Sequence, residues 1–172
     1  MRKILLLIFF VLVIGCTSNA SQNLKVKPLV TEPNEKNSSS NLIKYKVIRV
    51  IDGDTVELKN GERLRYNDID TPETVHPSKP VECYGPQASA KNKDLVEGEI
   101  ILVELGDPEK DRYGRLLGYV YIDDLFVNAE LVRGGYAEVN SYGNPGSKFN
   151  ELIQIENKAK SKPTGLWANC VN

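Results

Sequence analysis

Residues 46–58 read KVIRVIDGDTVEL, and this stretch decides the fold. Two runs rich in β-branched residues flank Asp52-Gly53, and an Asp-Gly pair between such runs predicts a tight turn that joins antiparallel strands. Asn60-Gly61 predicts a second turn shortly afterwards. Two later runs are rich in alternating apolar or aromatic side chains. The predicted strands are residues 46–51, 55–58, 63–66, 100–105 and 116–122.

Helix signals occur in three places, at residues 85–96, from Asn128 to the Gly134-Gly135 pair, and at 147–160. Pro86 stands in the first turn of the first helix, and Gly98 follows its last residue. Asn128 is a good N-cap for the second helix, with Val127 and Val132 spaced for a hydrophobic staple. Five strands with a helix after the third resemble an OB-fold barrel. We therefore expect an α+β fold, a five-stranded OB-fold barrel with about three α-helices.

Composition limits the classes of protein to consider. The chain has 172 residues, 41% hydrophobic and 26% charged, which suits one ordinary globular domain. Its formal net charge of −1 excludes a strongly basic nucleic-acid coat, so any nucleic acid must be bound by a local cluster of cations. The single histidine, His76, argues against nucleases that use a pair of histidines and against zinc sites built from several His and Cys.

The N-terminus has the pattern of an export signal. Met-Arg-Lys precedes the apolar run 4–14, which matches a signal peptide and is too short to cross a bilayer as a helix. The run ends in Val-Ile-Gly-Cys16, which resembles the lipobox of bacterial lipoproteins; a plain secretory signal or an uncleaved anchor is the alternative. The expected organisation is a lipoprotein signal peptide at 1–15, lipidated Cys16 with a flexible tether to residue 41, and one domain at 42–172. We expect an exported protein, lipid-anchored to the cell envelope membrane on its extracellular or periplasm-facing side.

The chain has three cysteines, and an exported lipoprotein has a use for each of them. Lipidation of Cys16 leaves Cys83 and Cys170 in a compartment where disulfides persist. A bridge between them is a hypothesis, and two free thiols are the alternative.

Two acidic segments carry possible metal ligands. They are Asp52-Gly53-Asp54-Thr55 and Asp70-Thr71-Pro72-Glu73, and either alone could be an ordinary turn. Together they offer carboxylates from two loops, and a hard cation such as Ca²⁺ prefers a mixture of carboxylate, carbonyl and water oxygens.

Arginines form the third chemical element, in Arg63-Leu64-Arg65 and in residues 111–115, which read DRYGR. Solvated surface charge is the commonest use of arginine. Phosphodiester hydrolysis, however, needs donor forks for phosphate oxygens, and guanidinium supplies them bidentately. Arg65 and Asp70 are five residues apart, which places them on opposite faces of a straight strand, so their convergence requires a bulge or turn near Asn67-Asp68.

Several segments are similar to staphylococcal-nuclease-type thermonucleases. They are 47–55 (VIRVIDGDT), 70–77 (DTPETVHP), 84–90 (YGPQASA), 111–115 (DRYGR), 127–135 (VNAELVRGG) and 165–167 (GLW), in the order of that family. The resemblance covers roughly residues 45 to 167 and identifies the domain as nuclease-like.

This resemblance implies a calcium-dependent nuclease that hydrolyses DNA and RNA and leaves 3′-phosphates. Asp54, Asp70 and the main-chain carbonyl of Thr71 would hold Ca²⁺. Glu73 would orient or deprotonate the attacking water, while Arg65 and Arg115 would bind the scissile phosphate. A catalytically silent OB-fold nucleic-acid-binding lipoprotein is the alternative, although such modules usually lose the carboxylates or arginines. We expect a monomer.

The chain also departs from the family's pattern. Arg112 and Tyr113 match a Lys-Tyr pair that contacts a terminal phosphate, which keeps the charge but changes its geometry. The family's two tyrosines near the base are not matched, since only Tyr142 lies nearby in this chain, and this puts base stacking in doubt. An apolar or Gly step before Asp70 is replaced by Tyr66-Asn67-Asp68-Ile69, which we expect to tune calcium affinity.

Overall fold

The computed structural model describes residues 42–75, 78 and 80–170. The predicted signal peptide, Cys16 and the tether lie outside these residues, as does His76. Within the described part of the chain, no helix has the length and apolar character needed to cross a bilayer.

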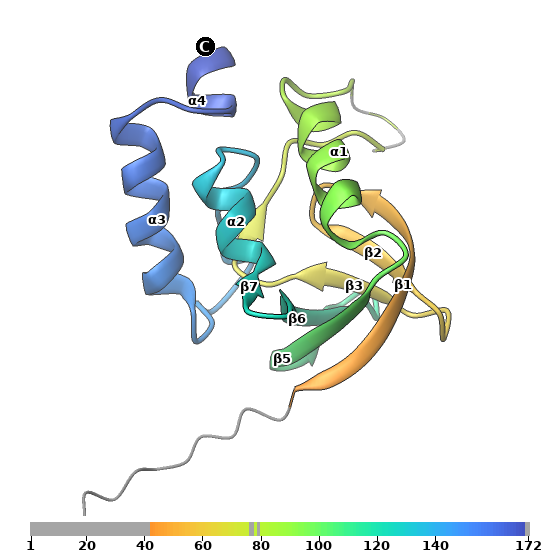
Figure 1. Ribbon diagram of the computed structural model, residues 1–172. Helices are drawn as coiled ribbons and strands as arrows, with labels where there is room; N and C mark the ends of the chain where they lie inside the picture. The colour runs from red at the N-terminus through yellow and green to blue at the C-terminus, as the bar shows by residue number, and fades with distance from the viewer. Residues whose placement is uncertain (1–41, 76–77, 79, 171–172) are drawn as a thin grey trace, which may run out of the picture. The chain divides into compact units, whose positions relative to one another are not determined.

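A closed barrel of five strands is the centre of the domain (Figure 1). The barrel strands are β1 (Ile43–Asp52), β2 (Thr55–Leu58), β3 (Arg63–Tyr66), β5 (Ile100–Lys110) and β6 (Leu116–Ile122). They lie in the order β3-β2-β1-β5-β6, and a parallel pairing of β3 with β6 closes the circle. The predicted five-stranded OB-fold of the α+β class is confirmed.

The barrel forms where the sequence alternates between apolar and polar side chains. Ile101 and Val103 on β5 point inward and are completely buried, as are Val47, Val56 and Leu64 on the first three strands. The register of β1 against β2 shifts twice, between Val47 and Arg49 and between Val50 and Asp52. Such bulges bend a strand and increase its twist, which allows the long β1 to pair with β2 at one end and with β5 at the other.

Three strands of two residues each were not predicted. They are β4 (Ile69–Asp70), β7 (Leu125–Phe126) and β8 (Glu138–Val139). Two residues are too few to show an alternating pattern, so tertiary pairing creates these strands: β4 pairs with β8, and β7 pairs with β6. The β4–β8 pair places residues 138–139 beside Asp70.

The helices lie above and to the left of the barrel in Figure 1. They are α1 (Gly85–Val96), α2 (Val127–Arg133), α3 (Phe149–Ser161) and the one-turn α4 (Leu166–Asn169). The three longer helices agree with the predicted ones to within a few residues. Leu131 and Val132 of α2 and Leu152 of α3 are fully buried and belong to the same core as the barrel.

The prediction that Asn128 caps α2 was wrong. The N-cap is Phe126, and no side chain caps that end. Asn128 is completely buried instead. Its side-chain oxygen accepts the Val120 N–H at 3.0 Å, and its amide donates to the Asn67 carbonyl at 3.0 Å. Because α2 packs on β6, a polar side chain in its first turn faces the barrel and bonds to strand backbone.

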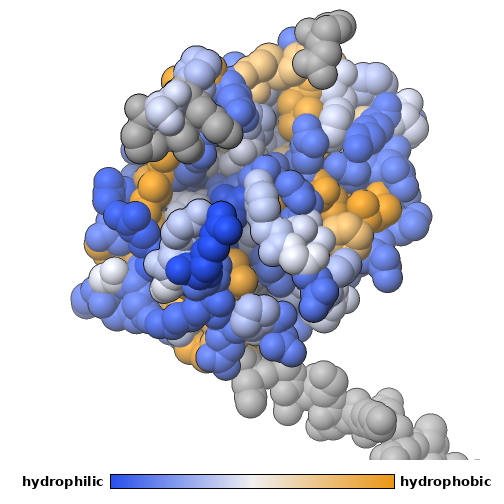
Figure 2. Space-filling view, turned by 180° about the vertical axis from the view of Figure 1, so that it is seen from behind, coloured by the Kyte–Doolittle hydropathy of each residue, from blue (hydrophilic) through white to orange (hydrophobic). Residues whose placement is uncertain are grey.

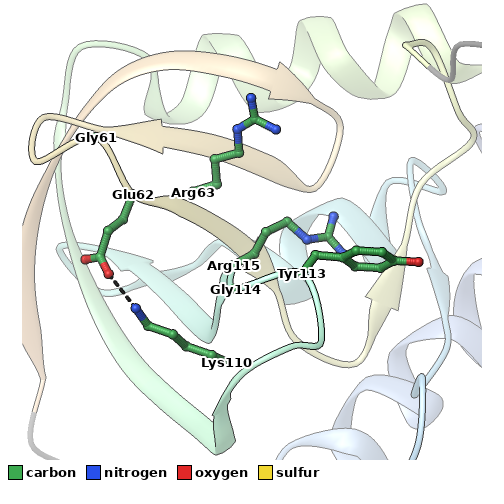
Figure 3. A pocket seen from close by; sticks show the side chains of 7 residues that line it. All are labelled: Gly61, Glu62, Arg63, Lys110, Tyr113, Gly114 and Arg115. Atoms are coloured by element: carbon green, nitrogen blue, oxygen red, sulfur yellow. Dashed lines mark hydrogen bonds and ion pairs between the residues drawn. The ribbon is translucent and has the colours of Figure 1, made fainter.

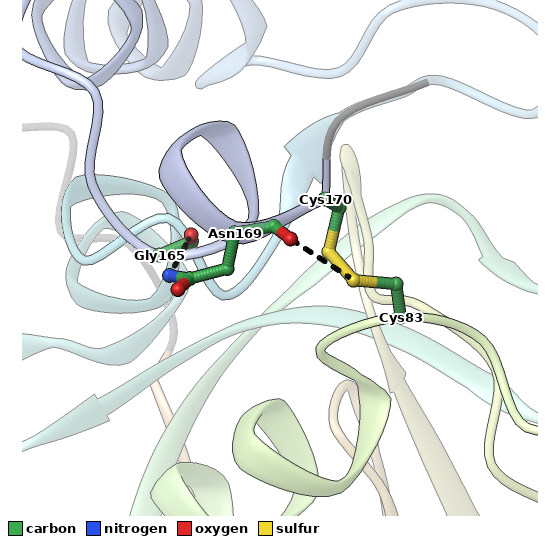
Figure 4. The surroundings of a disulfide bond; sticks show 4 residues. All are labelled: Cys83, Gly165, Asn169 and Cys170. Atoms are coloured by element: carbon green, nitrogen blue, oxygen red, sulfur yellow. Dashed lines mark hydrogen bonds between the residues drawn. A yellow bond between two sulfur atoms is a disulfide. The ribbon is translucent and has the colours of Figure 1, made fainter.

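A disulfide joins Cys83 and Cys170, with the two Cα atoms 5.8 Å apart (Figure 4). Cys83 stands two residues before α1, and Cys170 directly follows α4. The bond therefore fastens the end of the chain to the segment that leads into α1.

We expect Cys170→Ser to lower the free energy of unfolding by roughly 2–5 kcal/mol, because the bridge restricts a long loop in the unfolded chain. Urea denaturation of both proteins without reductant measures this loss. With reductant, the wild-type protein should become as unstable as the variant. Two thiols that react with an alkylating agent in unreduced, unfolded wild-type protein would contradict the bridge.

Candidate active site

One cavity of about 830 Å³ opens at the side of the barrel where β3, β4 and the loop after β8 meet. Seven residues that the sequence analysis singled out line it, namely Arg65, Asp70, Glu73, Arg112, Tyr113, Arg115 and Tyr142. The two other predicted site residues, Asp54 and Thr71, are buried, with 1% and 7% exposure. Asp54 is hydrogen-bonded to Arg65 and to Thr71. Asp54 and Thr71 therefore adjoin the cavity wall at Arg65.

The tight turn between β1 and β2 holds Asp54. A Cβ on Gly53 would lie 2.6–2.8 Å from the side chain of Thr71, so only glycine allows Thr71 to pack on this turn. As a result the Thr71 N–H and hydroxyl donate to Asp54 Oδ2 at 2.8 and 3.0 Å. Thr55 donates its hydroxyl to Asp54 Oδ1. The Asp54 carboxylate is thus fixed in the protein interior.

Arg65 bridges the two acidic loops. Its Nη1 lies 2.5 Å from Asp54 Oδ1, and its Nη2 lies 2.6 Å from Asp70 Oδ1. The chain turns at Asn67-Asp68, where Asp68 adopts a left-handed conformation with φ of 59°. The predicted turn at Asn67-Asp68 is therefore confirmed, and it brings Asp70 to the same side as Arg65.

Burial makes the Asp54 carboxylate dependent on a cation. Burial raises the pKa of Asp54, whereas the charge of Arg65 and the Thr71 N–H lower it, and the net shift is upward. The charge of nearby Asp70 adds to the rise. A buried carboxylate is costly unless it is paired. The pair of acids therefore requires positive charge between them, which Arg65 provides in this structure.

The donor set suits a hard cation. Two carboxylates converge on one guanidinium, and both offer only oxygen atoms. Among the described residues, no three His, Cys, Asp or Glu side chains gather where they could hold a metal ion. Calcium takes six to eight oxygen ligands, so carbonyl, water and phosphate oxygens would have to complete its shell. The residues fit calcium and do not fit a zinc site of several His and Cys.

Glu73 is held by its own loop. Its N–H donates to Glu82 Oε2 at 3.0 Å, and its carbonyl accepts the Glu82 N–H at 2.9 Å. Its carboxylate accepts the N–H groups of Thr74 and Val75. At Gly85, a Cβ would meet the Thr74 side chain at 2.8 Å, so α1 packs closely on this loop. Glu82, one residue before the disulfide, therefore helps to set the position of Glu73.

Asp111 orients Arg115, and both residues line the cavity. Its Oδ2 accepts Arg115 Nε at 2.7 Å, and its Oδ1 accepts the backbone N–H groups of Tyr113 and Arg115. Burial alone would raise the pKa of Asp111, but these bonds lower it overall. The guanidinium carbon atoms of Arg112 and Arg115 lie 4.8 and 5.6 Å from the centre of the Tyr113 ring. The DRYGR segment thus presents two guanidinium groups around one exposed tyrosine.

Tyr142 covers the acidic pair from outside. Its hydroxyl donates to Asp70 Oδ2 at 2.5 Å, and its ring centre lies 5.3 Å from the Arg65 guanidinium carbon. Asp68 anchors the Tyr142 loop, since it accepts the Gly146 N–H at 3.0 Å and the buried Tyr119 hydroxyl at 2.5 Å. The departure at Asp68 from the family's pattern therefore has a structural use.

Asp52 is a further residue at the site that the sequence analysis left without a role. It is 8% exposed, and its Oδ1 accepts the Thr74 hydroxyl at 2.7 Å. Burial raises the pKa of Asp52 to about 6, and a hydrogen bond with Glu73 contributes, while bonds from Thr74 and Gly53 oppose the rise. Asp52, Asp68 and Asp111 each act through a neighbour. The sequence signals that could have drawn attention to them are the quoted motifs, which contain Asp52 and Asp111, and the predicted turn at Asn67-Asp68.

Comparison with known proteins shows that the chain is similar to nucleases. Residues 63–169, which include every side chain that lines the cavity, match the family described as staphylococcal nuclease homologue. A thermonuclease of Staphylococcus hyicus is 40% identical over 136 residues, or 77% of this chain and 80% of that protein. Endonuclease YncB of Bacillus subtilis (strain 168) is 38% identical over 142 residues, or 79% of this chain and 66% of that protein. A thermonuclease of Staphylococcus intermedius is 40% identical over 127 residues, covering 72% of this chain and 75% of that protein.

The raised pKa of Asp52 predicts a pH dependence of stability. The folded state binds the proton more tightly than the unfolded state, so this group lowers stability as pH rises from about 4 to about 6. With chelator present, the free energy of unfolding of the wild-type protein should fall by on the order of 2–3 kcal/mol between pH 4 and pH 7 because of this group. Asp52→Asn should not show this fall. Urea denaturation at both pH values tests this, with Asp124→Asn in the exposed β6–β7 turn as the control. Parallel pH profiles for wild type and Asp52→Asn would disprove it.

Proposed function

The chain belongs to the staphylococcal nuclease family and is a hydrolytic nuclease, and from this premise we propose that it is a calcium-dependent enzyme. It cleaves phosphodiester bonds of DNA and RNA at the 5′ oxygen and leaves 3′-phosphates. It works as a monomer, anchored at the cell envelope by a lipid on Cys16.

The observation that carries the proposal is the pair of carboxylates joined by Arg65. Asp54 and Asp70 come from different loops, yet they lie within 2.5 and 2.6 Å of one guanidinium group. Two acids that share one cation in this way supply the charge and the hard oxygens that calcium prefers. The cavity beside them is lined by further guanidinium groups, which a phosphodiester requires.

Asp54, Asp70 and the Thr71 carbonyl are the residues that would hold calcium. When bound there, calcium supplies Lewis-acid polarisation of the phosphate and aligns water for attack. With calcium balancing the charge of Asp54 and Asp70, the Arg65 N–H groups would be free to bond to phosphate oxygens. Arg65 therefore has two sets of partners, the carboxylates in the free protein and the substrate phosphate in the complex.

Arg65 and Arg115 stabilise the reaction. Water attacks phosphorus and the bond to the 5′ oxygen breaks. In the transition state, negative charge grows on the phosphate oxygens. Guanidinium groups fixed in advance, as Asp111 fixes Arg115, stabilise that growing charge at no reorganisation cost. Glu73 lines the same cavity and orients the water or accepts its proton.

The decisive experiment is hydrolysis of denatured DNA and of RNA by the purified protein, first with calcium and then with excess chelator. Calcium-dependent cleavage with 3′-phosphate ends supports the proposal. Cleavage that persists in chelator, or products with 5′-phosphates, would overturn the calcium mechanism.

Glu73→Gln and Arg115→Ala should each lower kcat at least about 100-fold, because each removes stabilisation of the transition state. Steady-state hydrolysis of denatured DNA measures the effect. Glu151→Gln and Arg133→Ala are matched controls, since both residues lie at exposed positions on helices outside the cavity. Near-normal turnover by folded Glu73→Gln or Arg115→Ala would refute the role assigned to that residue.

The anchoring proposal rests on the sequence around Cys16, which lies outside the described residues. In bacterial cells, Cys16→Ala should move the protein from the membrane fraction to the soluble fraction and abolish incorporation of labelled fatty acid. A wild-type protein that incorporates no fatty acid would exclude lipidation.

A further inference from the structure

A second hollow of about 610 Å³ adjoins the active-site cavity (Figure 3). It lies between the turn after β2 and the segment that joins β5 to β6. Its lining residues are Gly61, Glu62, Arg63, Lys110, Tyr113, Gly114 and Arg115. Lys110, Tyr113 and Arg115 also line the active-site cavity, so the two hollows share a wall. A chain that leaves one can continue directly into the other.

The second hollow carries an excess of positive charge. Three of its side chains are cations, and Glu62 is its only acid. Glu62 Oε1 lies 2.8 Å from the Lys110 ammonium, so the charge of Glu62 is neutralised by Lys110. Arg115 is paired with Asp111, which does not line this hollow. The remaining cation, Arg63, has no such acid beside it.

Arg63 is exposed and lacks a partner of its own. Across the residues that the structure describes, its guanidinium makes no hydrogen bond, ion pair or ring contact. Glu57 is its cross-strand neighbour on β2, but the Glu57 carboxylate binds Arg49 at 2.5 Å. The guanidinium donors of Arg63 are therefore available to a ligand.

Strand geometry aligns Arg63 with the catalytic arginines. Arg63 and Arg65 are two residues apart on β3, so their side chains leave the same face about 6–7 Å from each other. In the parallel β3–β6 pairing, Leu64 is opposite Leu116, so Arg63 and Arg115 flank the same end of this ladder. Figure 3 shows the Arg63 side chain extending from β3 and the Arg115 side chain extending from the segment just before β6. The three arginines, which we call the basic row, thus come from neighbouring positions at one end of the β3–β6 ladder.

We propose that the second hollow is a phosphate subsite, in which Arg63 binds a phosphodiester of the substrate strand next to the scissile one. This inference rests on the proposed nuclease function. A phosphate matches the site because a guanidinium fork binds it bidentately and because successive phosphates recur along one strand. The strand passes over Tyr113 and Arg115, the wall that both hollows share. Longer single strands consequently bind more tightly than short ones.

Binding in the presence of chelator tests the subsite without hydrolysis. Fluorescent oligothymidylates of two and of eight nucleotides are titrated with the full-length protein at several salt concentrations. For the octamer at low salt, Arg63→Gln should raise Kd about three- to tenfold and lower the slope of log Kd against log salt by about 0.7, the loss of one single-strand phosphate contact. Both changes should be smaller for the oligothymidylate of two nucleotides.

Arg133→Gln is the matched control, because Arg133 is also an exposed arginine but lies on α2, outside both hollows. It should keep the wild-type salt slope. Arg63→Lys should restore the slope but only part of the affinity, since lysine keeps the charge and loses the fork. A salt slope for Arg63→Gln equal to that of Arg133→Gln would overturn the subsite.

Hydrolysis separates failure of the subsite from failure of the proposed function. Arg63→Gln should lower kcat/KM more for the octamer than for the dimer, mainly through KM. If wild type hydrolyses both substrates and Arg63→Gln lowers both equally, the subsite is wrong and the nuclease mechanism stands. If wild type hydrolyses neither, the mechanism fails, and the salt slopes in chelator still decide the subsite.

Discussion

The guanidinium of Arg65 holds together two carboxylates that reach the site from different loops, and the rest of the site depends on this contact. Asp54 is almost completely buried, and a buried acid without a counter-charge is strongly destabilising. Arg65 offsets that cost and fixes the distance between Asp54 and Asp70 at the same time.

The strand pairing of the barrel brings the members of this contact together. The β1–β2 turn supplies Asp54, and β3 carries Arg65 beside it, since Thr55 and Arg65 are paired across β2 and β3. Closure of the barrel through β3 and β6 brings Arg115 to the same region, and the β4–β8 pair carries the Tyr142 loop over Asp70. The face of the molecule drawn in Figure 2 is mainly hydrophilic and carries separate apolar patches. Charged side chains from these separate elements, among them Arg65, Asp70 and Arg115, line the site.

Much of this arrangement could be predicted from the sequence because it follows from local patterns. The Asp52-Gly53 turn, the five alternating strands and the left-handed turn at Asp68 all have local causes. The two-residue strands do not, since they exist only through pairing with distant segments. Asn128 shows the same limit: its type suits a helix cap, but packing of α2 on β6 turns it into a buried link between Val120 and Asn67.

Charge distribution is the last constraint on how such a protein handles a polyanion. With a net charge of −1, the chain as a whole does not attract nucleic acid, so attraction must come from local cations such as those of the basic row. Two of its three arginines are held by acids in the free protein, which keeps them in place and reduces their pull on distant substrates. Arg63 alone is unopposed. In the proposed subsite, Arg63 therefore supplies a positive charge that no acid of the described residues neutralises, beside the paired Arg65 and Arg115.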